Sequence, residues 1–262
     1  MIGIFDSGIG GLTVAKEIFA ALPDYQVIYF GDTAHLPYGT KSPHAIKEWT
    51  SQIVRFLLTK KANVIVIACH TASAVAFGSL KKTFKTTPIF EIITPAIEEA
   101  MLVTKNGKIG VIGTFATVKS GVYAQKFHAS NPSLKIYSKA CPLLTPLVEE
   151  GWLHKKETTE IVKEYLQELK REQVDTLVLG CTHYPLLRKT ISEIMGPRVT
   201  IIDPGKDLAA TLKKFLAKNK EIARDSIKGA RHQFFVSDNP YNFKVLAQSA
   251  LGQTIHVKLV TI

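Results

Sequence analysis

The chain has 262 residues, 46% of them hydrophobic and 21% charged, which are ordinary values for a folded protein of one large or two medium domains. It has no run of about 18 consecutive apolar residues and no basic, apolar leader, so we expect neither a transmembrane helix nor a signal peptide. Its three cysteines are too few for a disulfide scaffold and indicate a reducing compartment, the cytoplasm.

The net charge of +11 comes from 33 lysines and arginines against 22 acidic residues. Such a protein attracts nucleic acid, anionic lipid or a small acidic substrate. The lysines mostly come in pairs at expected helix ends, such as Lys60-Lys61, without an RGG run, a basic tail or zinc-finger spacing. We therefore favour a solvated, lysine-rich surface over a nucleic-acid interface, and we expect no membrane partner.

Short runs rich in Val, Ile and Leu recur along the chain, each followed by a turn signal and most of them by a helical pattern. This alternation is typical of an α/β protein whose mostly parallel sheets are covered by helices on both faces. An amphipathic helix is predicted over 157–171, where Ile161, Tyr165, Leu166 and Leu169 share a face. The expected strands lie at 2–5, 26–30, 63–69, 108–113, 135–140, 175–181 and 198–203.

Two stretches of the first half return in the second half in the same order. IGIFDSGIGGLT (2–13) resembles IGVIGTFATVKS (109–120), and VIVIACHTASA (64–74) resembles TLVLGCTHYPL (176–186). This repeat predicts two similar α/β domains related by pseudo-twofold symmetry. In open parallel sheets, ligands lie beyond the carboxyl ends of the strands, where these motifs end, so we expect the active site in a cleft between the domains.

Proline interrupts the pattern near Thr94 and at Pro204. We therefore predict that residues 1–94 and 205–262 form the domain that carries Cys69, and that residues 95–204 form the second. The C-terminal segment would then return to the first domain.

The segment SGIGGL after the first strand invites comparison with a dinucleotide-binding turn. Gly8 and Gly10 fit its first two glycines, but Thr13 stands at the third position. The carboxylate of Asp6 would also repel a pyrophosphate. We favour a turn whose N–H groups, with the Ser7 hydroxyl, hold a small carboxylate at a helix N-terminus.

Cys69 and Cys181 each stand at an expected junction from strand to helix, where the helix dipole favours a thiolate. A single free cysteine is most often packing, and we assign that role to Cys141. Two cysteines at equivalent positions of a repeat indicate a function instead. A zinc site would also need His70 and His183, but adjacent Cys and His can seldom both reach one metal, so we expect no metal.

A Cys-His hydrolase would need one nucleophile and one base, and it gives no reason for a second, equivalent cysteine. Two thiols suit a reaction that removes a proton from one face of a carbon and returns one to the other face, as in racemisation or epimerisation. After the second strand, we assign His35 to ordering its loop. For Tyr38-Gly39, a plain turn and ligand binding through the backbone both stay open.

The motifs FDSGIGGL, GDTAHLPYG, ACHTASA, IGVIGTFATV, ACPLLTPLVEEG and GCTHYPLL together resemble, over nearly the whole chain, the pyridoxal-phosphate-independent aspartate/glutamate racemase family. Its aspartate enzymes tend to carry Glu where His183 stands, so the resemblance is to the glutamate racemase branch. It implies interconversion of L-glutamate and D-glutamate without a cofactor, in a cytoplasmic homodimer that supplies D-glutamate for peptidoglycan synthesis. The alternatives are racemisation of another acidic amino acid such as aspartate, or a non-enzymatic role in binding DNA or gyrase.

The resemblance also implies a role for each matching residue. Cys69 and Cys181 would be the two acid/base residues, with Asp6 supporting Cys69 and His183 supporting Cys181. The carboxylates and ammonium of the substrate would be held by Asp6, Ser7, Tyr38, Gly39, His70, Thr71, Thr114, Thr117, Thr182 and His183.

One departure from the family concerns His70, because the family commonly has Asn directly after the first cysteine. A neutral imidazole offers one donor and one acceptor, as an amide does in a different shape. We therefore expect glutamate racemisation to survive with an altered KM or pH profile.

Overall fold

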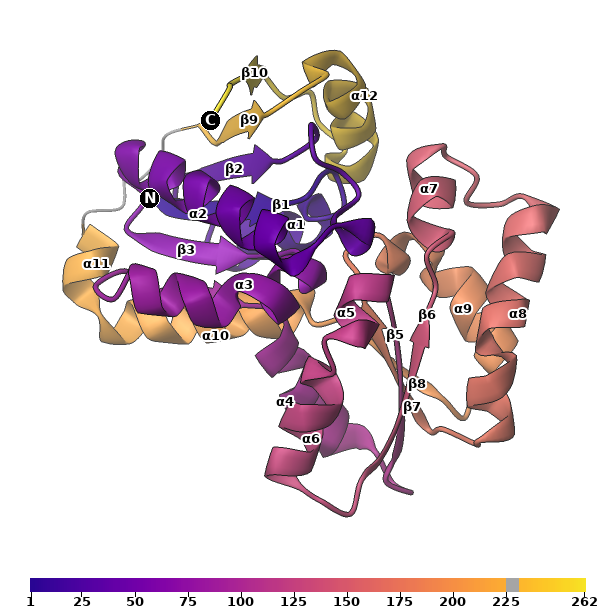
Figure 1. The fold of residues 1–262 in the computed structure, drawn as a ribbon. Helices are drawn as coiled ribbons and strands as arrows, with labels where there is room; N and C mark the ends of the chain where they lie inside the picture. Colours follow the sequence, from indigo (N-terminus) through magenta and orange to yellow (C-terminus); the bar gives the residue numbers. More distant parts are fainter. Residues whose placement is uncertain (225–230) are drawn as a thin grey trace.

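The computed structural model describes residues 1–224 and 231–262, which build two parallel β-sheets with helices against their faces (Figure 1). The first sheet has the strand order β10-β9-β2-β1-β3-β4, and the second has the order β6-β5-β7-β8. The strands are Ile2–Asp6 (β1), Val27–Gly31 (β2), Val64–Ile67 (β3), Ile89–Glu91 (β4), Lys108–Gly113 (β5), Lys135–Ala140 (β6), Thr176–Gly180 (β7), Thr200–Ile202 (β8), Gln233–Val236 (β9) and Val257–Leu259 (β10).

Helices connect most successive strands, as the alternating sequence pattern predicts. None of those in the described ranges combines the length and the apolar character needed to cross a membrane. The α-helices are Leu12–Ala21 (α1), Pro43–Thr59 (α2), His70–Thr83 (α3), Ile93–Val103 (α4), Phe115–Lys119 (α5), Val122–Ser130 (α6), Leu144–Glu149 (α7), Lys156–Arg171 (α8), Arg188–Met195 (α9), Gly205–Lys218 (α10), Lys220–Arg224 (α11) and Pro240–Leu251 (α12). Tyr38–Thr40 (η1) and Tyr184–Leu187 (η2) are short 3-10 helices.

The two sheets repeat one arrangement of strands. The order β2-β1-β3-β4 in the first sheet returns as β6-β5-β7-β8 in the second, so β1 corresponds to β5 and β3 to β7. Equivalent strands are also paired alike, with Ile2 opposite Val64 and Ile109 opposite Thr176. The duplicated order confirms the two similar α/β halves that the sequence repeat predicts.

The chain passes from the first sheet to the second and then returns. α4 follows β4 and contacts β7 and β8 of the second sheet. After β8, α10 packs on α1, and β9 then pairs in parallel with β2, as the yellow segment of Figure 1 shows. The division into one domain of residues 1–94 and 205–262 and another of residues 95–204 stays a prediction.

The central strands are buried on both faces, because alternate side chains of a strand point to opposite sides of its sheet. Ile4 and Val66 belong to a hydrophobic cluster that continues to Val111 in the second sheet. Phe5 and Ile65 point the other way, into a cluster formed with α2 and α3. Full burial of each such side chain contributes roughly 1.5–3 kcal/mol to folding. The first cluster joins the two sheets into one continuous core.

α8 matches the predicted helix over 157–171, but its buried face is turned slightly from the predicted one. Leu166 and Leu169 are buried as expected, and Val162 is the third buried hydrophobic residue. Ile161 and Tyr165 are only partly buried at the edge of the same cluster. The spacing of residues 162, 166 and 169 follows the helical period more closely than the predicted set does.

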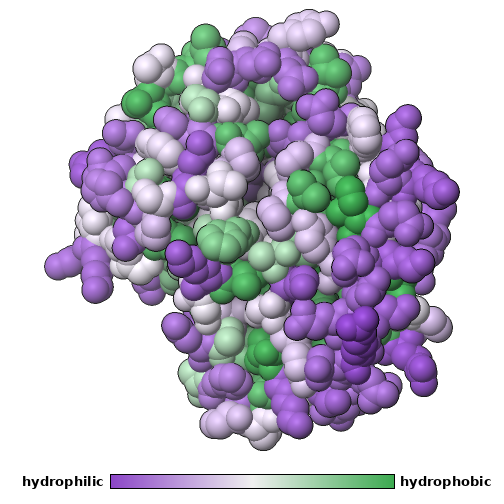
Figure 2. All heavy atoms as spheres, turned by 45° about the vertical axis from the view of Figure 1, so that its right-hand side comes forward, coloured by the Kyte–Doolittle hydropathy of each residue, from purple (hydrophilic) through white to green (hydrophobic). Residues whose placement is uncertain are grey.

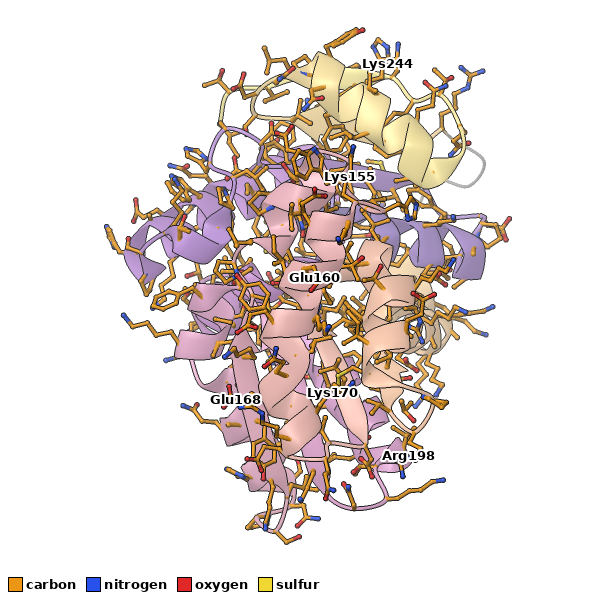
Figure 3. All side chains as sticks on the ribbon, turned by 90° about the vertical axis from the view of Figure 1, so that its right-hand side faces the viewer. Lys155, Glu160, Glu168, Lys170, Arg198 and Lys244 are labelled. Carbon is orange, nitrogen blue, oxygen red and sulfur yellow. The ribbon has the colours of Figure 1, made fainter. Side chains whose placement is uncertain are left out.

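The surface is mostly hydrophilic on the face that Figure 2 shows, with apolar side chains in small groups. On the face formed by α8, charges of both signs alternate, including Lys155, Glu160, Glu168 and Lys170 (Figure 3). Glu168 forms an ion pair with Lys139 at 3.0 Å. This mixture is typical of a solvated surface rather than of a basic stripe for nucleic acid.

Candidate active site

The sequence motifs meet beyond the carboxyl ends of equivalent strands in the two sheets. β1 ends at Asp6 and β3 leads to Cys69, while β5 leads to Thr114 and β7 to Cys181. Residues from both sheets therefore line one cavity. Its walls are Ser7, Leu36, Pro37, Tyr38, Gly39, Cys69, His70, Thr71, Thr114, Thr145, Cys181, Thr182 and His183.

The cavity is narrow. It leaves about 20 Å³ for the centres of water-sized molecules, which is room for one or two waters. A ligand as large as an amino acid needs more space than this, so some of the cavity walls must move to admit it, and their return would exclude water from the thiols.

Cys69 is the N-cap residue of α3, a helix of 14 residues. Its Sγ accepts a hydrogen bond from the Ala72 N–H at 3.5 Å and donates one to the Ser7 hydroxyl at 3.8 Å. Burial, and then the nearby Asp6 carboxylate, raises the pKa of the Cys69 thiol to about 12. The helix terminus alone predicts a thiolate, but burial and Asp6 outweigh the dipole, so Cys69 is a thiol at neutral pH.

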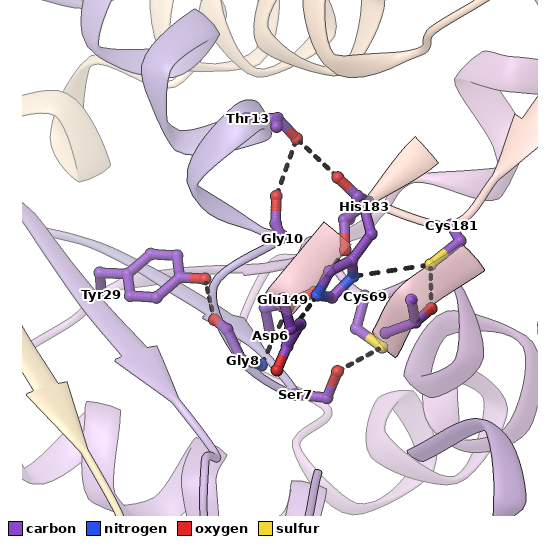
Figure 4. Close-up of polar contacts among 12 residues, drawn as sticks. Asp6, Ser7, Gly8, Gly10, Thr13, Tyr29, Cys69, Glu149, Cys181 and His183 are labelled. Atoms are coloured by element: carbon purple, nitrogen blue, oxygen red, sulfur yellow. Dashed lines mark hydrogen bonds and ion pairs between the residues drawn. The ribbon is translucent and has the colours of Figure 1, made fainter. Parts of the chain in front are cut away.

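Cys181 lies between an imidazole and a hydroxyl. His183 Nδ1 and Thr145 Oγ1 are each 3.7 Å from its Sγ, and His183 Nε2 is 2.7 Å from Glu149 Oε1 (Figure 4). Burial lowers the pKa of His183, but hydrogen bonds and charge at Cys181 and Glu149 outweigh burial and raise that pKa to about 10. His183 is therefore an imidazolium at neutral pH, and its positive charge lies beside the Cys181 sulfur.

Asp6 is buried behind the cavity rather than in its wall. Its carboxylate accepts hydrogen bonds from the Gly8 N–H at 2.9 Å and from the Thr182 hydroxyl at 3.2 Å. Burial raises the pKa of Asp6, while the charge of His183 and these hydrogen bonds oppose the rise. Within the described ranges Asp6 has no hydrogen bond to Cys69, so it acts on that thiol through its charge.

Three threonine hydroxyls link the two halves beside the cavity. Thr71 at the start of α3 is 2.9 Å from Thr114 and 3.2 Å from Thr117, and the latter two are 3.0 Å apart. Thr71 and Thr114 line the cavity, whereas Thr117 lies behind them. Hydroxyls that can donate or accept suit the carboxylate and ammonium groups of a small amino acid.

The loop after β2 is held from the first sheet. The Tyr38 hydroxyl donates to Asp32 Oδ2 at 2.5 Å, and the Ser237 hydroxyl donates to Asp32 Oδ1 at 2.7 Å. His35 lies 2.9 Å from the same carboxylate and stacks on Trp49, away from the cavity walls. His35 thus orders its loop, as predicted, and the loop brings Tyr38 and its neighbour into the cavity wall.

Most of the predicted site residues therefore meet in one place, with Asp6 and Thr117 directly behind the wall. Sequence reasoning missed Thr145 and Glu149, which α7 places against Cys181 and His183. The acidic pair in the motif ACPLLTPLVEEG could have pointed to Glu149. No pattern within the motif shows that α7 faces the second cysteine.

His70 and His183 each have partners of their own within the protein. The described ranges contain no group of three His, Cys, Asp or Glu residues placed to hold a metal ion. His70 Nδ1 is 2.8 Å from the Tyr123 hydroxyl, and His183 is held between Cys181 and Glu149. Cys141 lies at full burial in a hydrophobic cluster, as predicted for a packing residue.

Comparison with known proteins agrees with this geometry. The sequence profile of the Asp/Glu/Hydantoin racemase family matches residues 7–212. A glutamate racemase from Geobacter metallireducens is 43% identical over 251 residues, which cover 96% of this chain and 92% of that protein. The crystal structure of a glutamate racemase isoform from Bacillus anthracis has a TM-score of 0.94 at 38% identity. The match covers 100% of this chain and 97% of that one. The crystal structure of a glutamate racemase from Francisella tularensis in complex with D-glutamate has a TM-score of 0.92 at 36% identity. This match covers 99% of this chain and 97% of that one.

Proposed function

Because the chain belongs to the Asp/Glu/Hydantoin racemase family, we propose that it interconverts L-glutamate and D-glutamate. The observation that carries the proposal is that Cys69 and Cys181 line one cavity from equivalent strand ends of two sheets. The similarity to glutamate racemases over nearly the whole chain supports glutamate as the substrate.

In the proposed reaction, a thiolate removes the α-proton from one face of the amino acid and the facing thiol delivers a proton to the other face. The α-proton is far less acidic than a thiol, so the carbanion is the difficult species. Cavity donors and the substrate's own ammonium stabilise the developing charge where water is excluded. Tyr38, Gly39, His70 and the hydroxyls of Ser7, Thr71, Thr114 and Thr182 would hold the substrate, with Thr117 behind them.

The two thiols have different surroundings. Cys181 lies beside the imidazolium of His183, while burial keeps Cys69 protonated. Because Cys69 starts as the acid, Cys181 would act as the base for one enantiomer. For the other enantiomer the roles reverse, with Asp6 supporting Cys69 and His183 supporting Cys181. No cofactor takes part in this proposal.

The direct test follows the circular dichroism of D-glutamate with the purified protein, with EDTA present and no pyridoxal phosphate added. Loss of the signal toward the racemic value is the expected result, and an unchanged signal would contradict the proposal. Aspartate, assayed in parallel, tests the alternative substrate.

A second experiment tests the use of two bases by running the reaction in D2O. At early times the product enantiomer should carry deuterium at the α-carbon, while the remaining substrate keeps its original proton. Equal early exchange into the substrate would argue for a single base that works on both faces.

We also propose that the protein is a cytoplasmic homodimer whose D-glutamate is used for peptidoglycan synthesis, and that its domains comprise residues 1–94 with 205–262 and residues 95–204. The family resemblance supports the dimer and the cell-wall role, and the three free cysteines support a reducing compartment. Light scattering of the purified protein tests the dimer.

A further inference from the structure

His70 and Tyr123 form a buried hydrogen bond at the edge of the cavity. His70 follows Cys69 at the start of α3 and lines the cavity, while Tyr123 comes from α6 beside the other sheet. His70 Nδ1 is 2.8 Å from the Tyr123 hydroxyl, and the two side chains are 2% and 3% exposed. The Tyr123 ring also lies beside Gly180, so it sits behind the end of β7, the strand that leads to Cys181.

The direction of this hydrogen bond follows from the protons available. In the described part of the chain, His70 Nδ1 is the one hydrogen-bond partner of the Tyr123 hydroxyl. A buried hydroxyl proton without an acceptor is unfavourable, so the hydroxyl donates to Nδ1. Burial lowers the pKa of His70 to about 3, so the ring is neutral at physiological pH and its one proton is on Nε2.

The second ring nitrogen has no partner within the described protein. Two side-chain atoms in the described ranges are both sealed from solvent and without a partner, namely Gln26 Oε1 and Glu99 Oε2. His70 Nε2 is not one of them, so this unpaired nitrogen is not sealed from solvent. Since Nδ1 faces Tyr123 and His70 lines the cavity, Nε2 is the ring atom open to the cavity.

We propose that Tyr123 is a positioning residue that holds His70 as the Nε2–H tautomer, so that His70 offers a donor and no acceptor to a substrate carboxylate. This inference rests on the proposed function and assigns the contact within its site. An amide at this position could hold either a carboxylate or an ammonium, whereas an imidazole fixed in this way selects the carboxylate. Because His70 stays neutral near pH 7, the effect of this residue falls on KM rather than on the pH profile.

Nitrogen-15 NMR of the histidine rings tests the tautomer without reference to activity. The His70 signals, assigned by their loss in His70→Asn, should show the proton on Nε2 in the native protein, and D-glutamate should shift the Nε2–H signal. A proton on Nδ1 would overturn the proposal. Absence of racemisation with the Nε2–H form present would instead count against the proposed function, so the two failures are distinguishable.

Tyr123→Phe removes the hydroxyl and keeps the ring. The expected result is a mixture of His70 tautomers and a KM for glutamate raised roughly two- to fivefold with a smaller change in kcat. Tyr184→Phe is the matched control, because that buried hydroxyl donates to the backbone carbonyl of Cys141 and its loss should leave the His70 tautomer unchanged. A pure Nε2–H form or an unchanged KM in folded Tyr123→Phe would overturn the role of Tyr123, and if that variant does not fold, the native spectrum alone still decides the tautomer.

Discussion

Cys69 and Cys181 differ in the charge that lies beside each thiol, yet the proposed reaction needs both. Replacing either cysteine with serine leaves a hydroxyl that is far less acidic than the thiol. Cys69→Ser and Cys181→Ser should each lower kcat in both directions by roughly 10²- to 10⁴-fold. Circular dichroism, started from each enantiomer in turn, measures both directions.

Cys141→Ser is the control for this pair. Cys141 is buried like the other two cysteines, but it lies in the hydrophobic cluster under α8 and its Sγ donates to the Lys139 carbonyl at 3.6 Å. Its replacement should leave turnover close to that of the native protein. Native-like turnover in either cavity variant would exclude a two-thiol reaction.

The protonation of His183 makes the stability of the protein depend on pH. Its pKa in the folded protein is raised to about 10, above the value of 6.5 expected in the unfolded chain. The folded state therefore holds more protons between these values, and the stability due to His183 is complete below pH 6.5 and is lost as the pH rises toward 10. Unfolding in urea from pH 6.5 to 8.5 should show this fall in the free energy of unfolding. This range lies below the pH at which the titration of Cys69 begins to change stability.

Glu149→Gln isolates the carboxylate from this effect. The amide cannot supply the negative charge that favours the imidazolium, so the pKa of His183 should fall and the decline in stability should become shallower. The alkaline limb of the kcat profile should move to lower pH for the same reason. Superimposable pH curves for the two proteins would show that Glu149 does not set the protonation of His183.

At the scale of elements, the turn from β1 to α1 approaches the second half so closely that it needs a glycine. A Cβ at Gly10 would lie 2.5 Å from Thr182 Oγ1 and 2.6 Å from His183 Nδ1. Gly10→Ala should therefore cost about 1–3 kcal/mol of stability and lower activity by displacing these side chains. Chemical denaturation and the racemisation assay measure the two effects.

Gly78→Ala is the matched substitution. Gly78 lies in α3, and a Cβ there would meet no atom within 4 Å. It should stabilise the protein by about 0.5–1 kcal/mol, because alanine loses less backbone entropy in a helix. If Gly10→Ala were as stable and as active as Gly78→Ala, the close approach of the turn would matter neither for stability nor for activity.

The sequence predicts the local features of these elements well, but it predicts the contacts between elements poorly. The strands that end at Asp6 and near Cys69 and Cys181 are continuous apolar runs, which is why they could be placed within one or two residues. β4, β9 and β10 are short and partly mixed in composition, so no comparable signal announces them. Thr145, Glu149 and Tyr123 reach the site through contacts between elements, and a pattern along one segment does not contain such contacts.

For the whole molecule, the narrow cavity predicts that substrate stabilises the closed arrangement of the two halves. A ligand at about 100 times its Kd adds roughly 2.7 kcal/mol to the free energy of unfolding. In a protein of this size that raises Tm by about 5–10 °C. Differential scanning calorimetry with D-glutamate checks the shift, and D-glutamine, which lacks one carboxylate, is the control. Equal shifts with both compounds would mean that the second carboxylate is not recognised.

The return of the chain to its first sheet limits how the cavity can open. One covalent crossing runs through α4 and the other through α10, and these two helices contact each other. Two neighbouring attachments resist sliding and twisting of the two halves but allow a hinge rotation about the line that joins them. We therefore expect each closure to return Cys69 and Cys181 to the same separation, so that the chain path itself keeps the two acid/base groups in position from one turnover to the next.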